Sequence, residues 1–488
     1  MMKKLLIFIV LSTCLISCND FLETFPKGQI VAKTTSDFRL LLDNADTRYT
    51  HNLSQTSIYI DVVSDDSQVS YDTWVDWIDK RTHVKQLYAF EKEVWLPDGA
   101  SGDVVWKNAY YISTLISNIL DEIYRADDNL RLQMQLTAEA RVHRAYAYLT
   151  LVNTYAKHYN AATAASDPGV PLIQNPVDLP SLERASVQKV YDFILADLLE
   201  SVDDLPEEVS QQYSHRPTKP AAYAILARTY LYMGNYEEAA LYADKSLAMH
   251  PFLYDYNTIY TGNASSDNLI GISRTNDQEM LLHKTTTKGA HLREYMQLDT
   301  ITFNTLYSDY TIVDTTTTQN RDLRRPLWFS NLNENGKLLS ERVAYVFSDA
   351  SHRYAVDNDG NVDYTSVATP EMYVTRAESN ARLGKLQEAI NDINELRKHR
   401  FKTGSYTDVT LTDLENNQQK VIEETLLERR RELYGKDLRL FDIKRLQLAV
   451  EHSLGSETKS VPANDPKLIW PVHYEYLNLN PEIGQTPR

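Results

Sequence analysis

Residues 220–251 read PAAYAILARTYLYMGNYEEAALYADKSLAMHP and carry the most regular pattern in the chain. Apolar and small residues recur at three- and four-residue steps on both sides of Gly234, which is typical of two packed helices. Gly234 stands where the first helix should end, and the small Ala239 lets the second helix lie close against it. The frame matches a tetratricopeptide unit at Tyr223, Leu226, Ala227, Tyr230, Gly234, Ala239, Ala243 and Pro251. We therefore predict a mostly α fold built on a tetratricopeptide-like helical scaffold.

The same frame returns downstream at Tyr373, Ala377, Gly384 and Ala389, with the same spacing from glycine to alanine. Because the two frames lie far apart in the chain, they do not form a continuous array. The intervening residues 252–369 have a different texture, rich in Thr, Asp, Asn and Tyr, with strand-like pieces such as residues 344–347. We expect this segment to be an insert of loops and short strands that lies over the scaffold and faces a ligand.

Several other stretches have helical spacing. We expect a helix capped at Ser36-Asp37 with Phe38, Leu41 and Leu42 on one face. A strongly amphipathic helix is predicted to start at Thr137 and run to residue 156, and another to run from Ser186 to Leu205. Residues 103–125 show a stripe of apolar residues at Val105, Ala109, Ile112, Ile116, Ile119 and Ile123. The helices of 371–400 and 418–450 follow the insert.

The N-terminus reads MMKKLLIFIVLSTCLISCNDFLE. Lys3 and Lys4 precede an apolar run that is too short to span a bilayer and has the length of a secretory signal. The run ends in Leu15-Ile16-Ser17-Cys18, which resembles the lipobox of bacterial lipoproteins. We expect residues 1–17 to be a lipoprotein signal peptide and Cys18 to carry the lipid; the alternative is an ordinary secretory signal with an incidental cysteine.

Composition excludes several classes of function. The net charge of −17 repels nucleic acid, and the one dense basic cluster, residues 429–431, is flanked by glutamates. Of the two cysteines, Cys14 leaves with the signal and Cys18 is lipidated, so the mature chain has no thiol for a metal, a disulfide or catalysis. We expect no nucleic-acid partner, no metal and no cofactor.

Six short motifs in order point to one family. They are CNDFLE at 18–23, AEARVHRAYAY at 138–148, GVPL at 169–172, TRAE at 375–378 with Gly384-Lys385, ERRREL at 428–433 with DIKR at 442–445, and WPV at 470–472 with Asn480-Pro481. Together they resemble the SusD/RagB-like family, the surface lipoproteins of Bacteroidetes nutrient-uptake loci. The acidic Asp20 and Glu23 are similar to the signal that sends such lipoproteins to the cell surface.

The resemblance implies a single SusD-like domain and a binding function. Such a protein captures a nutrient, most often a glycan, and delivers it to a SusC-like TonB-dependent transporter in the outer membrane. The expected organisation is a signal peptide, 1–17, and one domain, 18–488, with an aromatic loop region at 51–100, helical units at 103–251 and 371–450, the insert at 252–369 and an irregular tail at 462–488. Because ligand contacts vary within the family, no ligand residue is carried over from it.

Sugar binding requires flat aromatic faces together with polar side chains for the hydroxyls. Region 51–100 supplies Tyr59, Tyr71, Trp74, Trp77, Tyr88 and Trp95. We select Tyr71, Trp74 and Trp77 as ligand-binding residues, with Trp328 second; a helical turn would put Trp74 and Trp77 on one face. The alternative is that these rings are core residues that hold a loop in place.

Glu428, Arg431 and Asp442 lie in the scaffold motifs, and we interpret them as an ion-pair cluster between helices. Catalysis by an acid beside these arginines is disfavoured. The sequence holds no HExxH, Gly-x-Ser-x-Gly or phosphate-binding loop, so we expect no enzyme. Two further alternatives remain open, a peptide-binding uptake protein of the RagB type and a pure assembly module, because tetratricopeptide-like helices commonly bind protein.

We predict that Cys18→Ala abolishes membrane association, because the lipid would be the only anchor. Fractionation of cells into outer-membrane and released material measures this. Retention of the variant in the outer-membrane fraction would contradict the lipid-anchor hypothesis.

We also predict that Trp74→Ala or Trp77→Ala weakens ligand binding without unfolding the protein. Binding titrations and thermal unfolding of each variant separate the two roles. A lower melting temperature with unchanged affinity would identify these rings as core residues.

Overall fold

The computed structural model describes residues 32–43, 53, 60–69, 82–96, 102–174, 181–259, 277–284, 297–307, 322–328, 342–344, 366–454, 457–486 and 488. The signal peptide predicted at 1–17, Cys18, and the predicted ligand residues Tyr71, Trp74 and Trp77 lie outside these ranges.

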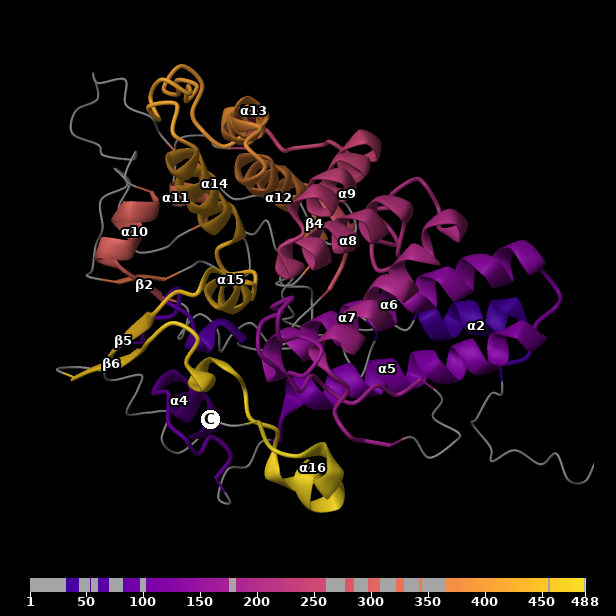
Figure 1. The fold of residues 1–488 in the computed structure, drawn as a ribbon. Helices are drawn as coiled ribbons and strands as arrows, with labels where there is room; N and C mark the ends of the chain where they lie inside the picture. Colours follow the sequence, from indigo (N-terminus) through magenta and orange to yellow (C-terminus); the bar gives the residue numbers. More distant parts are fainter. Residues whose placement is uncertain are drawn as a thin grey trace, which may run out of the picture.

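The scaffold is a stack of helices that runs from α5 at one end to α13 and α14 at the other (Figure 1). Its members are α5 (Val104–Glu122), α6 (Leu130–Tyr155), α7 (Val187–Leu199), α8 (Lys219–Met233), α9 (Tyr236–Met249), α12 (Thr369–Arg382), α13 (Leu386–Lys398) and α14 (Gln418–Leu433). Each packs against the next in this order, except that α14 packs on both α12 and α13. The mostly α fold is confirmed.

The two tetratricopeptide-like units are neighbours in space. Helix α9 of the first unit packs directly on α12 of the second, although the insert separates them in the chain. Gly234 and Gly384 end the first helix of each unit in the left-handed region, with φ of 73° and 77°, where a residue with a Cβ is disfavoured. Ala239 and Ala389 are fully buried, as the pattern predicted. The insert therefore leaves and rejoins a continuous stack.

Two of the predicted helix starts are wrong. Helix α6 begins seven residues before Thr137, because the Asn129 side chain caps it by accepting the Leu132 N–H at 3.1 Å. Helix α2 (Thr35–Leu42) is capped by Thr34, with Asp37 completing a capping box. Leu41 on α2 is 37% exposed and does not share the buried face of Phe38 and Leu42.

Helix α6 also differs from prediction in its burial. Residues 138–140 and 142–155 of α6 are buried on every side, because α2, α5 and α7 all pack around it. A helix enclosed in this way carries no exposed polar face. The amphipathic pattern predicted for this helix is therefore wrong.

The described parts of the insert contain short strands, as predicted. Strand β1 (Met280–Leu282) pairs with β4 (Val367–Ala368), and β2 (Gln297–Asp299) pairs with β3 (Arg342–Ala344), both antiparallel. Two short helices, α10 (Thr300–Leu306) and α11 (Arg324–Trp328), accompany them.

Most of the remaining elements lie along the lower side of the stack in the view of Figure 1. They are η1 (Ile60–Val63), α4 (Thr82–Tyr88), α15 (Arg439–Leu446), the hairpin of β5 (Val450–Leu454) and β6 (Glu457–Val461), and α16 (Tyr474–Leu479). The helix predicted over 418–450 is thus two helices, broken by a turn at Gly435, where φ is 73°. The tail was predicted to be irregular; among its described residues it contains one α-helix, α16, and two short 3-10 helices, η7 (Pro466–Leu468) and η8 (Pro481–Ile483).

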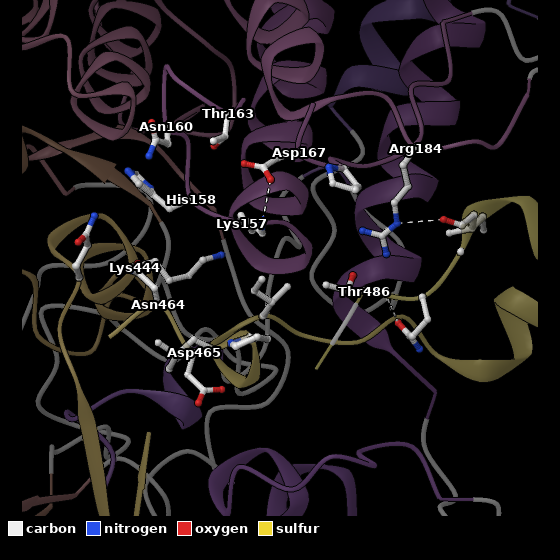
Figure 2. A pocket seen from close by; sticks show the side chains of 18 of the residues that line it. Lys157, His158, Asn160, Thr163, Asp167, Arg184, Lys444, Asn464, Asp465 and Thr486 are labelled. Carbon is white, nitrogen blue, oxygen red and sulfur yellow. Dashed lines mark hydrogen bonds and ion pairs between the residues drawn. The ribbon is translucent and has the colours of Figure 1, made fainter. Parts of the chain in front are cut away.

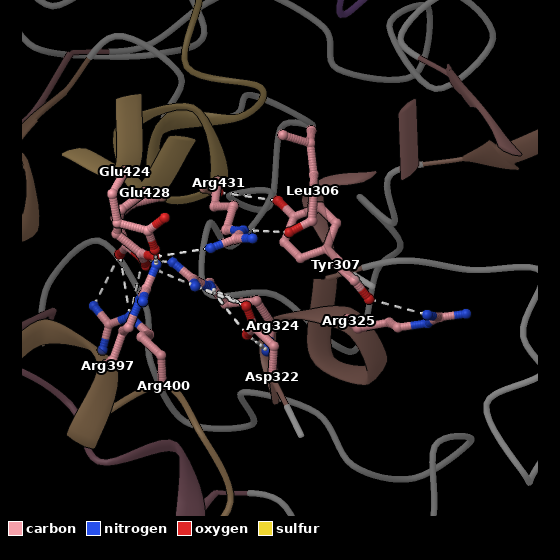
Figure 3. A network of polar contacts seen from close by, with 11 residues as sticks. Leu306, Tyr307, Asp322, Arg324, Arg325, Arg397, Arg400, Glu424, Glu428 and Arg431 are labelled. Atoms are coloured by element: carbon pink, nitrogen blue, oxygen red, sulfur yellow. Dashed lines mark hydrogen bonds and ion pairs between the residues drawn. The ribbon is translucent and has the colours of Figure 1, made fainter. Parts of the chain in front are cut away.

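The predicted ion-pair cluster exists and is divided into two networks. Glu428 on α14 meets Arg324 and Arg397 at 2.7 Å each and Arg431 at 3.2 Å (Figure 3). Asp442 on α15 instead meets Arg429 at 2.9 Å and Arg445 at 2.7 Å. The guanidinium groups around Glu428 hold the pKa of its carboxyl well below its usual value.

We predict that Glu428→Gln destabilises the fold by about 3–5 kcal/mol, because it leaves buried guanidinium groups without their counter-charge. Since the pKa of Glu428 is depressed in the folded state, its contribution is complete above the ordinary carboxyl pKa of 4.5 and is lost as the pH falls below it. Urea unfolding of both proteins at neutral and acidic pH measures the difference.

The matched control is Glu423→Gln, the same change on the exposed face of α14. Its stability should stay close to that of the parent. Equal stability of Glu428→Gln and Glu423→Gln at neutral pH would contradict the role assigned to this network.

Candidate functional site

A pocket of about 670 Å³ lies between the loop that follows α6 and the C-terminal tail (Figure 2). Residues 157–168 of the loop form one wall, and residues 464–469 and 482–486 of the tail form the other. Lys444 and Gln447 at the end of α15, and Arg184 before α7, complete the lining. We call this the tail pocket.

Lys444 contributes a buried ammonium group to the tail pocket. Its Nζ donates to the carbonyl oxygen of Ala156 at 2.7 Å and to that of Asn153, at the C-terminal end of α6. Carbonyl oxygens at a helix C-terminus carry partial negative charge and stabilise a cation. Burial nevertheless lowers the pKa of Lys444 to about 7.

Arg184 joins three backbone segments. Its Nε donates to the carbonyl oxygen of Ile483 in the tail at 3.1 Å. Its Nη1 donates to the carbonyl oxygens of Tyr155, at the end of α6, and of Gly169, at 3.1 and 3.0 Å. Burial lowers the pKa of this guanidinium. Arg184 therefore fixes the tail against the scaffold while lining the pocket.

The pKa of His158 is affected by the burial and the positive charges of the tail pocket. Burial, with the nearby positive charges of Lys444 and Arg445, lowers the pKa of His158 to about 3. The imidazole is therefore neutral at physiological pH, and it can donate or accept a hydrogen bond.

A second hollow of about 510 Å³ adjoins the first, and we call it the Trp95 groove. The half-buried Trp95 stacks on His83 with ring centroids 5.3 Å apart and meets the edge of His473 at 4.9 Å. Its Nε1 donates to the carbonyl oxygen of Pro471 at 2.8 Å, which fixes the ring. Tyr474 also lines the groove.

The two hollows share a wall. Gln485 and Thr486 line both of them. The Gln485 amide pairs with both backbone groups of Val472 at 2.9 Å, and the Thr486 hydroxyl donates to the Tyr155 carbonyl oxygen at 3.2 Å. An indole face beside amide and hydroxyl groups can contact both the C–H face and the hydroxyls of a sugar.

Of the predicted ligand residues, only Trp328 lies in the described ranges. It is 3% exposed, in α11, and its ring meets the edge of Tyr256 at a centroid distance of 6.3 Å. Trp328 is not among the residues that line the tail pocket or the Trp95 groove. The ligand contact at Trp328 stays a prediction. Trp95 belongs to the aromatic region 51–100 but was not singled out by the sequence pattern.

Comparison with known proteins identifies the chain's relatives. A family model described as "Starch-binding associating with outer membrane" matches residues 20–231, and the model of the SusD family matches residues 361–488. The chain belongs to the SusD/RagB-like family. No curated protein matches it.

Solved structures share the family fold along nearly the whole chain. A SusD superfamily protein from Bacteroides thetaiotaomicron is 18% identical with a TM-score of 0.70, over 93% of this chain and all of the other. A putative sugar-binding protein from Bacteroides vulgatus is also 18% identical, with a TM-score of 0.68 over 94% and 99% of the two chains. At this identity the likeness establishes the SusD-like fold alone.

Proposed function

We propose that this protein is a cell-surface lipoprotein that binds an oligosaccharide and delivers it to a SusC-like TonB-dependent transporter. The observation that carries the proposal is the pair of adjoining hollows, one with a fixed indole and one lined by amides and cations, on a scaffold of the SusD/RagB-like family. The family description and the sugar-binding neighbour support the ligand class.

The anchoring and location rest on the sequence. Cys18, after Leu15-Ile16-Ser17, is the proposed site of lipid attachment. Among the described residues, no helix combines the length and apolar character needed to cross a bilayer. The family description, which names the outer membrane, supports attachment to that membrane, with the body facing the exterior. The helical stack is the proposed surface for the transporter.

We favour a binding protein over a hydrolase because two of the three carboxylates that line the tail pocket have other partners and the third, Glu482, lies on its exposed rim. Asp167 pairs with Lys157 at 2.8 Å, and Asp465 accepts the backbone N–H of Lys467 at 2.8 Å. Peptide uptake of the RagB type is the second candidate, since the same amide groups bind peptide backbone equally well.

We predict that the mature body without its lipid binds oligosaccharides and leaves them intact. Trp95→Ala should weaken binding about ten-fold, the effect of removing one aromatic anchor. A glycan array followed by calorimetry on the best ligand measures the affinity, and chromatography of the recovered sugar tests for cleavage.

The matched control is Tyr124→Ala, which removes a 64% exposed ring at the far end of α5 and should leave affinity unchanged. Binding of peptides but no oligosaccharide, or release of shorter sugars, would contradict the proposed function.

A further inference from the structure

Several buried arginines in the described part of the chain are matched by carboxylates. Arg228 meets Glu371 at 2.6 Å, and Arg144 meets Asp197 at 2.8 Å. Arg324 and Arg400, both fully buried, also have acidic partners. Desolvating a charge is costly without such a partner, so an exception to this pairing is informative.

The half-buried Arg184 and the buried Lys444 lack such a partner, and both line the tail pocket. Within the described ranges, neither forms an ion pair with a carboxylate; their printed partners are backbone carbonyl oxygens. The carbonyl contacts also leave donors unused. Nη2 of Arg184 is buried without an acceptor in the described part of the chain. The Lys444 ammonium carries three hydrogens, and two are engaged.

The acidic residues of the tail pocket do not neutralise these two cations. Asp167 is engaged by Lys157, and Asp465 caps a turn. Glu482 is exposed, where water screens its charge. The lowered pKa of His158 has the positive charge of Lys444 among its causes. The buried Lys444 and the half-buried Arg184 are therefore the cationic lining residues without a carboxylate partner in the described part of the chain, whereas Lys157 is paired with Asp167 and Glu482 lies on the exposed rim.

We propose that the tail pocket binds the carboxylate of an acidic sugar unit, such as a uronic acid, between Arg184 and Lys444. Figure 2 places these two side chains on opposite sides of the hollow. The proposal rests on the proposed function and specifies its substrate class as acidic oligosaccharides.

The rest of the lining can hydrogen-bond the hydroxyls of a sugar. Five of the exposed lining residues carry an amide or a hydroxyl, namely Asn160, Thr163, Gln447, Asn464 and Gln485. The apolar Leu468, Ile469 and Ile483 are buried behind them. Neighbouring units of the same oligosaccharide would pass over Gln485 and Thr486 into the Trp95 groove, which has the aromatic face that a sugar ring requires.

The test compares matched ligands on the mature, unlipidated body. The acidic probes are short oligomers of galacturonate, glucuronate and alginate, and the neutral probes are the same oligomers after reduction of their carboxyl groups. Calorimetry should detect an acidic oligomer that binds roughly thirty-fold or more tightly than its reduced counterpart, the loss expected when one partner of a buried charge pair is removed. Inorganic phosphate and short peptides with a free carboxyl terminus are further probes.

Three variants locate the effect. Lys444→Met and Arg184→Gln remove each cation and should abolish the preference for the acidic oligomer. Both residues also hold the fold together, so Asn464→Asp provides an independent test, because it adds a negative charge on the exposed rim without touching either cation. It should weaken acidic binding roughly five-fold and leave neutral binding unchanged. The matched control is Gln387→Glu, the same change of charge on the exposed face of α13.

The outcomes separate this inference from the proposed function. Neutral oligomers that bind as well as acidic ones, or Asn464→Asp that behaves like Gln387→Glu, would overturn the carboxylate site and leave glycan binding intact. Phosphate that binds as tightly as the oligomers would indicate a site for free anions and overturn it too, as would peptides that replace sugars. If no oligosaccharide binds, whether acidic or neutral, the result would contradict the proposed function itself.

Discussion

The structure depends on five consecutive charged residues, 428–432, near the C-terminal end of helix α14. Glu428, Arg429, Arg431 and Glu432 are each at most 6% exposed, and a buried charge without a partner costs several kcal/mol. Each residue therefore requires a partner from elsewhere in the chain. Arg429 forms an ion pair with Asp442 of α15, and Arg430 forms one with Asp66 of the N-terminal part at 2.7 Å. Arg431 donates a hydrogen bond to the Leu306 carbonyl oxygen of α10. Glu432 forms ion pairs with Arg324 of α11 and with Arg400, which follows α13, each at 2.9 Å. One turn and a half of helix thus fixes the insert, the N-terminal segment and α15 relative to the stack.

The same network positions the tail pocket. Asp442 binds Arg429 and Arg445, and Arg445 in turn meets Glu378 of α12 at 2.6 Å, so α15 is held on the scaffold at several points. Lys444 lies between these ion-paired residues and reaches the end of α6. From the other side, Arg184 and Thr486 converge on the Tyr155 carbonyl oxygen. The pocket is therefore built around one helix C-terminus, which supplies the negative end of a dipole.

The local features of the fold could be predicted from sequence, and the long-range ones could not. Gly234 and Gly384 have a local conformational reason for their positions, and Glu428 and Asp442 stand in the charged motifs of α14 and α15. The contact of α9 with α12 was not predictable, because no local pattern reveals that an insert leaves and rejoins one stack. The sequence pattern predicted that α6 starts at Thr137. This was wrong because the Asn129 side chain caps the helix upstream of that residue. The tail pocket combines ordinary polar residues from two distant segments, so no local pattern predicts it. The one feature that could have pointed to it is Lys444, a buried lysine within the DIKR motif.

Arg184 and Lys444 bind backbone carbonyl oxygens and so hold the tail and α15 against α6. This structural role alone does not explain why both side chains are cationic. A helix C-terminus offers a few carbonyl oxygens, and the partial charge it presents is about half of one elementary charge. The guanidinium of Arg184 and the amino group of Lys444, whose pKa is lowered to about 7, meet there, so the backbone compensates only part of their combined charge. Backbone carbonyl oxygens can be satisfied by neutral N–H or O–H donors without the cost of a buried charge. What the two cations add beyond a neutral cap is residual positive charge facing a hollow large enough for a sugar unit. A carboxylate at that position would supply the counter-charge that the buried arginines named above receive from within the protein.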